Sequence, residues 1–223
     1  MILRMAALLA LAGLLAAGCG TVERILYDPL TEDEVRDLNE VRAQMLSGHT
    51  FEAQIDRRID QAVGQMARTL KPEFAKNRMG KYKLGFLEIT DIDRNTVTAL
   101  HNYVTEKALT FSFLHPKISR NFSIVERFLI KDVVREMEFE NTETPRRVVD
   151  QNLAQELGQI YHLDVIETGV TIESPDFLDI TLRMIETKRG RIIAVGSVKI
   201  EKTAPVRRWM ERMGEKGFGW GEY

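Results

Sequence analysis

The stretch from Asp91 to Asn95 reads DIDRN and has the Asp-x-Asp-x-Asn spacing of the first half of a calcium-binding loop. A complete EF-hand loop also needs glycine at its sixth position and glutamate at its twelfth, where this sequence has Thr96 and Asn102. We therefore interpret Asp93 or Asn95 as the N-cap of a following helix, because a short polar side chain can accept a hydrogen bond from an unpaired backbone N–H. The sequence predicts no metal ion and no other cofactor.

The histidines, serines and glycines also lack the spacing that metal binding, hydrolysis or dinucleotide binding requires. The histidines share no metal-ligand spacing with one another or with the single cysteine, so we interpret them as surface or boundary residues. The serines lack the Gly-x-Ser-x-Gly setting of a hydrolase nucleophile, and LGFLEITD has one glycine where a dinucleotide-binding loop has three. The residues considered are His49, His101, His115, His162, Ser112, Ser119, Ser123, Ser174, Ser197 and Gly85. The chain is expected not to be an enzyme.

The only cysteine, Cys19, follows an apolar run from Met5 to Ala17 that is preceded by a single charge, Arg4. A short basic start, an apolar run of roughly 7–15 residues and an exit of small residues are the parts of a signal peptide. The run is also shorter than the roughly 20 residues of a membrane span. Because the small residues 16–18 stop directly before the cysteine, the segment resembles a bacterial lipobox.

The lipobox resemblance implies that the chain is cut before Cys19 and that this residue carries lipid. Each buried CH₂ of a lipid chain contributes about 0.8 kcal/mol, so several chains anchor a protein stably where one does not. Gly20 stands where the best-known inner-membrane retention signal has aspartate. We therefore expect an outer-membrane lipoprotein that faces the periplasm, with residues 1–18 as the signal peptide.

Composition restricts the classes of partner. Removal of residues 1–18 leaves 205 residues, enough for one domain with a sizeable core. The one cysteine left, Cys19, is expected to carry lipid, so none is free for a disulfide. The cleavage also removes one of 31 basic residues, Arg4, and none of the 33 acidic ones, so the mature chain has a net charge of −3. A scattered charge of this sign argues against nucleic acid as a partner.

Two helices are expected before the sheet begins. Thr31, followed by three acidic residues, has the pattern of a helix N-cap, and residues 19–50 are interpreted as a lipidated tether with this short helix. From Phe51 to Leu70 apolar residues recur every three or four positions, and Pro72 follows. This pattern predicts an amphipathic helix that packs on the domain. A helix on the membrane surface is the alternative, which the interspersed acidic residues weaken.

The remaining pattern predicts an α/β (α+β) fold in which a mixed β-sheet carries packed helices. The expected order is strand, helix, strand, helix, helix, strand, strand, strand (β-α-β-α-α-β-β-β), ending in an antiparallel hairpin turned by Lys188, Arg189 and Gly190. The strands are expected at 81–90, 121–126, 164–172, 177–187 and 191–201, and the helices at 95–114, 127–140 and 148–161.

The segment NFSIVERFLIKDVVREMEFE resembles one in the CsgG-like group of envelope lipoproteins, where a strand ends in Val-Glu-Arg and a helix begins at once. Here these residues are Val125, Glu126 and Arg127, which we read as a helix start with a local ion pair. The run LGQIYHLDVIETG and the final hairpin agree with the same group. The resemblance covers about residues 80–202, and within the group the sequence is most similar to the flagellar FlgO family.

The resemblance implies a non-enzymatic assembly or structural factor of a surface organelle, the flagellum first, that binds another envelope protein. A membrane pore is not expected, because the sequence shows no extra pair of alternating strands. The alternative is a lipoprotein that activates a peptidoglycan synthase, a penicillin-binding protein. That role needs a long linker, and the segment before Phe51 contains only Pro29. A homo-oligomer is compatible with the sequence.

The domain is expected at residues 51–203, followed by an aromatic, glycine-rich tail at 204–223. Tryptophan, tyrosine, methionine and arginine are concentrated at interfaces, so the tail is a candidate partner-binding segment. Its candidate residues are Trp209, Phe218, Trp220 and Tyr223. The alternative is a terminal helix that folds back on its own domain.

Overall fold

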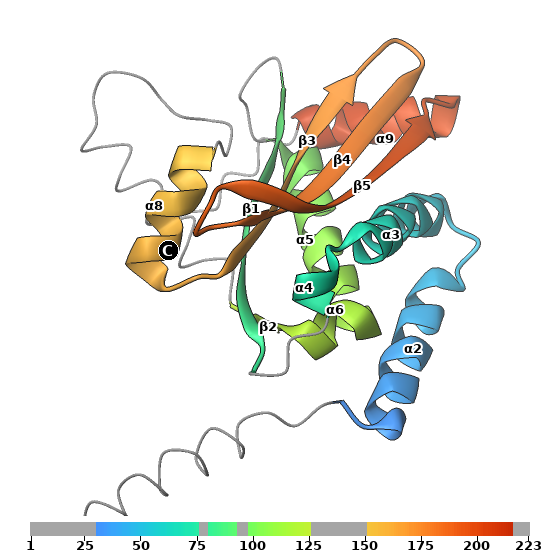
Figure 1. Ribbon diagram of the computed structural model, residues 1–223. Coiled ribbons are helices and arrows are strands. Elements are labelled where there is room, and N and C mark those ends of the chain that lie inside the picture. Colours follow the sequence, from blue (N-terminus) through green and yellow to red (C-terminus); the bar gives the residue numbers. More distant parts are fainter. Residues whose placement is uncertain (1–29, 76–79, 93–97, 126–150, 216–223) are drawn as a thin grey trace, which may run out of the picture.

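The computed structural model describes residues 30–75, 80–92, 98–125 and 151–215, which form a mixed α/β domain (Figure 1). The helices are α2 (Glu32–Leu46), α3 (Phe51–Thr69), α4 (Pro72–Ala75), α5 (Ala99–Leu114), α6 (Pro116–Asn121), α8 (Gln151–Tyr161) and α9 (Ala204–Glu215). The strands are β1 (Tyr82–Asp91), β2 (Phe122–Ile124), β3 (Val165–Glu173), β4 (Phe177–Glu186) and β5 (Arg191–Glu201). The predicted fold class is confirmed.

The five strands form one sheet in the order β2-β1-β3-β4-β5. β1 pairs in parallel with β2 and with β3, whereas β3, β4 and β5 are antiparallel. The turn between β4 and β5 includes Gly190, whose φ of 63° lies in the left-handed region that glycine adopts without steric cost. The expected C-terminal hairpin is therefore present at the expected place.

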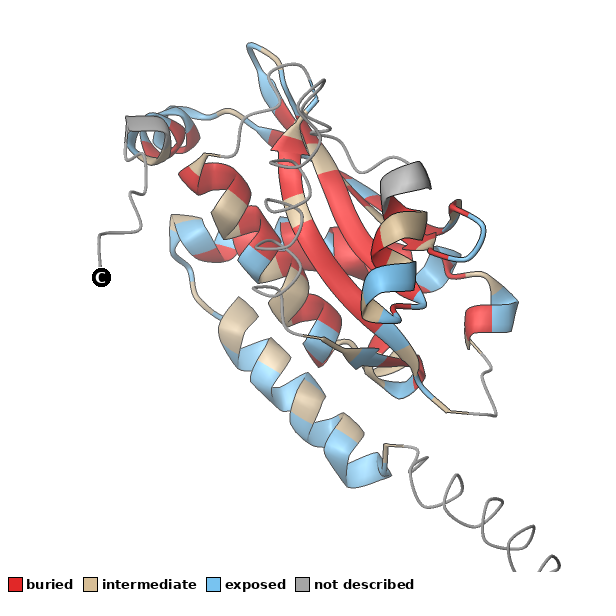
Figure 2. Ribbon diagram, turned by 90° about the vertical axis from the view of Figure 1, so that its left-hand side faces the viewer, coloured by how far each residue is buried: buried red, intermediate tan, exposed pale blue. Residues whose placement is uncertain are grey.

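The main core lies on the face of the sheet that α3 and α5 cover, and Figure 2 shows the strands and the inner sides of these helices as buried. The apolar positions of α3 face this core; Ile55, Ile59, Val63 and Met66 are each 2% exposed or less. This amphipathic helix is therefore a domain helix, as expected. The membrane-surface alternative is wrong, because the apolar face that would enter lipid is buried against the sheet.

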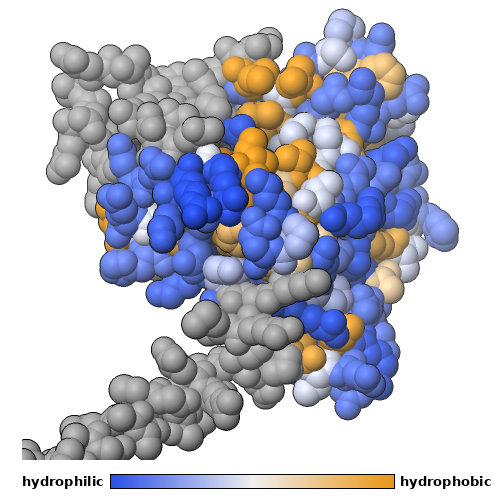
Figure 3. Space-filling view, viewed as in Figure 1, coloured by the Kyte–Doolittle hydropathy of each residue, from blue (hydrophilic) through white to orange (hydrophobic). Residues whose placement is uncertain are grey.

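A smaller core lies on the opposite face, where α8 packs on the sheet. Its members are Leu87, Ala154, Leu157, Leu163, Ile166 and Ile185. Beyond α8 this face carries exposed apolar side chains, among them Ile172, Phe177 and Val195. Figure 3 shows apolar surface gathered over the strands that face the viewer.

The helix α2 begins as the sequence predicts and is attached more firmly than the expected tether. Thr31 forms a capping box with Glu34, in which each side chain bonds the other residue's backbone N–H. Arg42 donates to both carboxylate oxygens of Asp60 on α3, with 2.8 Å between Nη2 and Oδ2. Arg57 of α3 donates in return to the carbonyl oxygen of Leu46 at the end of α2. The N-terminal helix is therefore part of the domain surface.

Two local expectations are corrected. The N-cap of α5 is Thr98, not Asp93 or Asn95. Strict alternation from the buried Ile193 would also put Val195 on the covered side of the hairpin, but Val195 is 38% exposed, because a register shift opposite Met184 and Ile185 puts an extra residue into β5. A one-residue shift moves the following side chains to the other face.

Several expected features lie outside the described residues: the signal peptide, Cys19, the helix at 127–140, and the tail residues Phe218, Trp220 and Tyr223. In the described part of the chain, no helix combines the length and apolar character that crossing a membrane requires.

Candidate functional site

A cavity of about 380 Å³ lies where the parallel strands β1 and β3 end, and Asp91 and Glu173 at these two ends both line it. The first turn of α5 and residues of α9 complete its wall. After β1 the chain continues to β2 on one side, whereas β3 continues to β4 on the other side. In open α/β sheets, ligands bind at the carboxyl ends of strands where the strand order reverses. This cavity is therefore the candidate site.

His101 from the first turn of α5 lies beside this cavity and is 4% exposed. The backbone N–H of Thr98 donates to its Nδ1 at 2.9 Å, and its Nε2 is 2.8 Å from Oγ1 of Thr171 on β3. Since Nδ1 accepts, Nε2 carries the hydrogen and donates to Thr171. Burial lowers the pKa of His101, although Asp91 and Glu173 act in the opposite direction. The ring is therefore neutral near pH 7.

His101 thus caps α5 and ties it to β3. The expectation that the histidines are surface or boundary residues is wrong for this one. The signal that would have found it is its position three residues after Thr98, where the side chain can return to the N-cap. Both ring nitrogens take part in hydrogen bonds within the domain, so the ring has a structural role.

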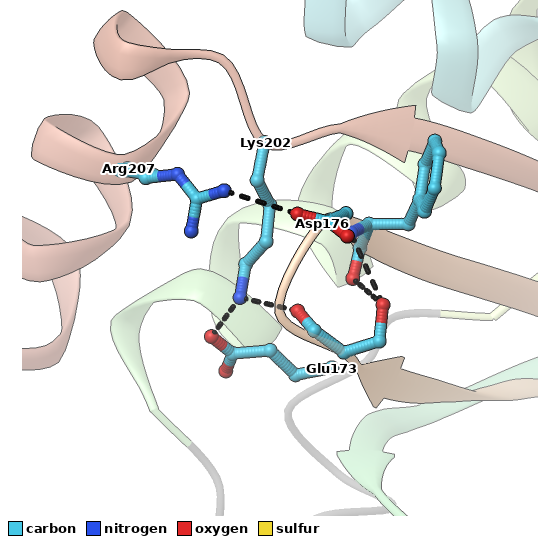
Figure 4. A network of polar contacts seen from close by, with 6 residues as sticks. Glu173, Asp176, Lys202 and Arg207 are labelled. Atoms are coloured by element: carbon cyan, nitrogen blue, oxygen red, sulfur yellow. Dashed lines mark hydrogen bonds and ion pairs between the residues drawn. The ribbon is translucent and has the colours of Figure 1, made fainter.

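The ammonium group of Lys202 contacts Glu173, the last residue of β3 (Figure 4). The Lys202 side chain is 9% exposed, and Nζ lies 2.6 Å from Oε1 of Glu173 and 2.7 Å from the carbonyl oxygen of Ser174. Arg207 on α9 lies 3.5 Å from the exposed Asp176 in the same turn. These contacts join the end of β5 and the start of α9 to the turn between β3 and β4. They hold the cavity wall in place.

The charged lining of the cavity is mixed. Three carboxylates, from Asp91, Glu173 and Glu211, face it together with the cations Lys202 and Arg207. Leu100, Leu178 and Met210 add apolar surface. Such a wall can bind a polar group by charge and hydrogen bonding, and the described residues that line it include no nucleophile paired with a base.

A second polar pair lies inside the domain. Ser112 on α5 and Glu167 on β3 are 0% and 2% exposed, and Oγ of Ser112 is 3.0 and 2.9 Å from the two carboxyl oxygens. Burial raises the pKa of Glu167 to about 8, which the bond to Ser112 only partly offsets. A protonated carboxyl can donate to the serine and accept from it. This pair joins helix to sheet and has no access to a substrate.

The tail begins as a helix that packs on the domain. Trp209 on α9 is 4% exposed and makes edge-to-face contacts with Phe51 of α3 at 5.8 Å and Tyr103 of α5 at 5.3 Å between ring centroids. The proposal that Trp209 binds a partner is therefore corrected, because its ring is already buried in the domain core. The spacing of Val206, Trp209 and Met210 was the sequence signal for this packing.

The calcium-like stretch can be followed only in part, because Asp93 and Asn95 lie outside the described residues. Within ranges 30–75, 80–92, 98–125 and 151–215, no group of three or more His, Cys, Asp or Glu side chains is placed to hold a metal ion.

No protein-family model and no curated protein matches this chain. Among solved structures it is similar to the LpoB C-terminal domain from Salmonella enterica, with 11% identity and a TM-score of 0.47 over 65% of this chain and 96% of that one. For the same domain from Escherichia coli the identity is 10% and the TM-score 0.44, with the same coverage. For lipoprotein GNA1162 from Neisseria meningitidis the values are 13% and 0.36 over 61% of this chain and 99% of that one. Because these TM-scores are below 0.5, the CsgG-like and FlgO-like resemblance stays a prediction.

Proposed function

We propose that this chain is a lipid-anchored outer-membrane lipoprotein that faces the periplasm and acts by binding another envelope protein, without catalysing a reaction. The observation that carries the proposal is Cys19, which directly follows small residues and an apolar run of signal-peptide length. A cysteine in that position can serve as a lipid attachment site, and it has no second cysteine in this chain with which to form a disulfide.

The described site supports binding over catalysis. The side chains that would serve an enzyme are already engaged in holding the fold: His101 caps α5, Lys202 bridges to Glu173, and Ser112 is buried against Glu167. An enzyme instead places a nucleophile or a general base within reach of a substrate.

The short tether supports a role close to the membrane. The sequence alone allowed about thirty residues between Cys19 and the domain, but α2 is bound to the domain through Arg42 and Asp60. The tether is therefore the twelve steps from Cys19 to Thr31, which span at most about 43 Å when fully extended. An assembly factor at the outer membrane fits this reach better than an activator that must cross the periplasm.

Flagellar assembly is the specific role that we propose first, on the sequence resemblance to FlgO. Activation of a peptidoglycan synthase is the competing outcome, and the two are distinguished by the partner. Flagellar outer-membrane structures should be isolated from cells that carry the wild-type chain or Cys19→Ala, and the chain quantified in them. We expect it to co-purify with these structures only when Cys19 is present. Absence from them, together with stimulation of a purified peptidoglycan synthase, would replace the flagellar role by the activator role.

A further inference from the structure

A groove of about 460 Å³ lies between α2 and β2, away from the cavity described above. Its apolar walls are Leu30, Leu38, Phe113, Phe122 and Ile124. The ring of Phe113, at the C-terminal end of α5, is 53% exposed. An exposed aromatic ring beside several aliphatic side chains makes a surface that gains free energy when another apolar segment covers it.

The groove also contains the edge of the sheet. β2 is the outermost strand of the sheet that the described residues form, and it pairs with β1 on one side (Figure 1). Edge strands present backbone N–H and C=O groups to any extended segment that lies beside them. An occupant of this groove can therefore combine apolar contacts with backbone hydrogen bonds.

The chain itself supplies an occupant of matching chemistry. The described residues begin at Leu30, which is one wall of the groove, and the residues just before it read Ile25-Leu26-Tyr27. This is the only run of three consecutive apolar or aromatic residues between Cys19 and Leu30. Tyr27 is three residues from Leu30, a distance of at most about 10 Å along an extended chain.

We propose that residues Ile25–Tyr27 dock in this groove against Phe113 and β2. Linkage to Leu30 makes the contact intramolecular, with an effective concentration on the order of millimolar, so a short apolar segment is sufficient. Isoleucine and tyrosine also favour the extended conformation that pairing beside a strand requires.

The consequence for the anchored protein rests on the proposed function. With Ile25 docked, only six steps of chain separate it from a lipidated Cys19, which is a reach of at most about 22 Å. The β2 edge would then be held at the membrane surface, and the cavity at the carboxyl ends of β1 and β3 would face away from it, because β2 pairs with the start of β1.

The test is disulfide trapping in the full chain, with Leu26→Cys combined with Ser123→Cys. Ser123 lies on β2 and lines the groove. The control pair is Leu26→Cys with Asp176→Cys, since Asp176 is exposed and lies in the turn at the opposite end of the sheet. We expect the first pair to form an intramolecular disulfide about tenfold faster than the control, as a local contact predicts. Equal rates, or a disulfide between two copies of the chain, would overturn the proposal.

A second comparison tests whether disulfide formation depends on the apolar surface of the groove. Phe113→Asp should slow disulfide formation in the first of these two pairs several-fold, whereas Ile160→Asp should not, because Ile160 is similarly exposed but lies on α8. Equal rates in the two variants would also overturn the proposal. Palmitate labelling of Cys19 in the same samples reports the lipid anchor independently, so failure of the anchor and failure of docking are distinguishable.

Discussion

At the scale of single residues, Glu167 and Cys19 have the clearest measurable consequences. Glu167 is a carboxyl group inside the core that keeps its proton because burial penalises the charged form. Cys19 is the residue on which the proposed membrane location depends. Glu167 belongs to the folded domain and Cys19 to the proposed lipid anchor, so they are tested separately.

Glu167→Gln should remove a pH dependence of stability. The folded-state pKa is raised to about 8, so between the ordinary value of 4.5 and 8 the unfolded chain has released a proton that the folded chain retains. The free energy of unfolding of the wild type should therefore fall as pH rises through this window, by up to about 1.4 kcal/mol per pH unit, and level off above it. Urea unfolding at a series of pH values should show a flatter dependence for Glu167→Gln. Exposed Glu201→Gln is the control, and a variant slope equal to that of the wild type would contradict the prediction.

Cys19→Ala should abolish lipid attachment, because the thiol that would carry the lipid is lost. Metabolic labelling with a palmitate analogue measures this directly. The variant should accumulate as an uncleaved or unanchored species. Continued labelling of the alanine variant would refute the assignment of Cys19 and, with it, the placement at the outer membrane.

At the scale of elements, the stability of the domain should depend on the hairpin β4–β5 and on its contact with α3. In the sheet that the described residues form, β5 is an edge strand, and α3 bonds some of its outward backbone groups. Thr69 Oγ1 donates to the carbonyl oxygen of Val195 and accepts from its N–H, and Gln65 accepts from the N–H of Ser197. The helix therefore covers part of an edge that would otherwise invite another strand.

Leu182→Ala should cost about 2–5 kcal/mol, because the side chain on β4 is fully buried in the main core. Val195→Ala on β5 is the matched comparison and should cost less than about 1 kcal/mol, since surface substitutions have small effects. Denaturant unfolding measures both. Equal losses would mean that the register shift in β5 is wrongly placed.

Gly196→Ala should destabilise the domain by about 1–3 kcal/mol or more, as overpacking does. A Cβ at this position would lie 1.9 Å from the carbonyl oxygen of Ala62, so α3 would have to move away from β5. Gly64→Ala on α3 is a control of opposite sign. Its Cβ meets nothing closer than 3.7 Å, and alanine in a helix is favoured over glycine by about 0.5–1 kcal/mol. Thermal unfolding of the two variants should shift in opposite directions, and a stabilising Gly196→Ala would show that the close approach is absent.

At the scale of the whole molecule, the helices at both ends of the described chain pack on the domain. The N-terminal helix α2 and the C-terminal helix α9 are both attached to the domain, through Arg42–Asp60 and Trp209–Tyr103 respectively. What remains of the tail as a candidate partner-binding segment is Phe218, Trp220 and Tyr223. The tail hypothesis is therefore restricted to residues beyond α9.

Tryptophan fluorescence can report separately on α9, which contains Trp209, and on the residues beyond it, which contain Trp220. Trp220→Phe leaves Trp209, which should emit at the short wavelengths of a buried indole and should not respond to a partner. Trp209→Phe leaves Trp220, whose emission should be red in the free protein and shift to the blue when the partner binds. Blue emission from Trp220 in the free protein, insensitive to the partner, would contradict the tail hypothesis.

The elements whose signals are local could be located from the amino-acid sequence. Apolar spacing located α3, alternation located β4 and β5, the Thr31 and Glu34 pattern located the start of α2, and residues around Cys19 indicated export. Each of these depends on interactions within a few residues, such as a cap or one face of a helix, so the local pattern contains the needed information.

Contacts between residues that are distant in the sequence became visible in the folded domain. Ser112 and Glu167 are 55 residues apart, His101 and Thr171 are 70 apart, and Trp209 finds its place between Phe51 and Tyr103. The exposure of Val195 follows from a shift in the pairing of β4 with β5, and the need for Gly196 follows from the close approach of α3. These outcomes depend on strand register and on the packing of helices against the sheet, which no local pattern in the sequence specifies.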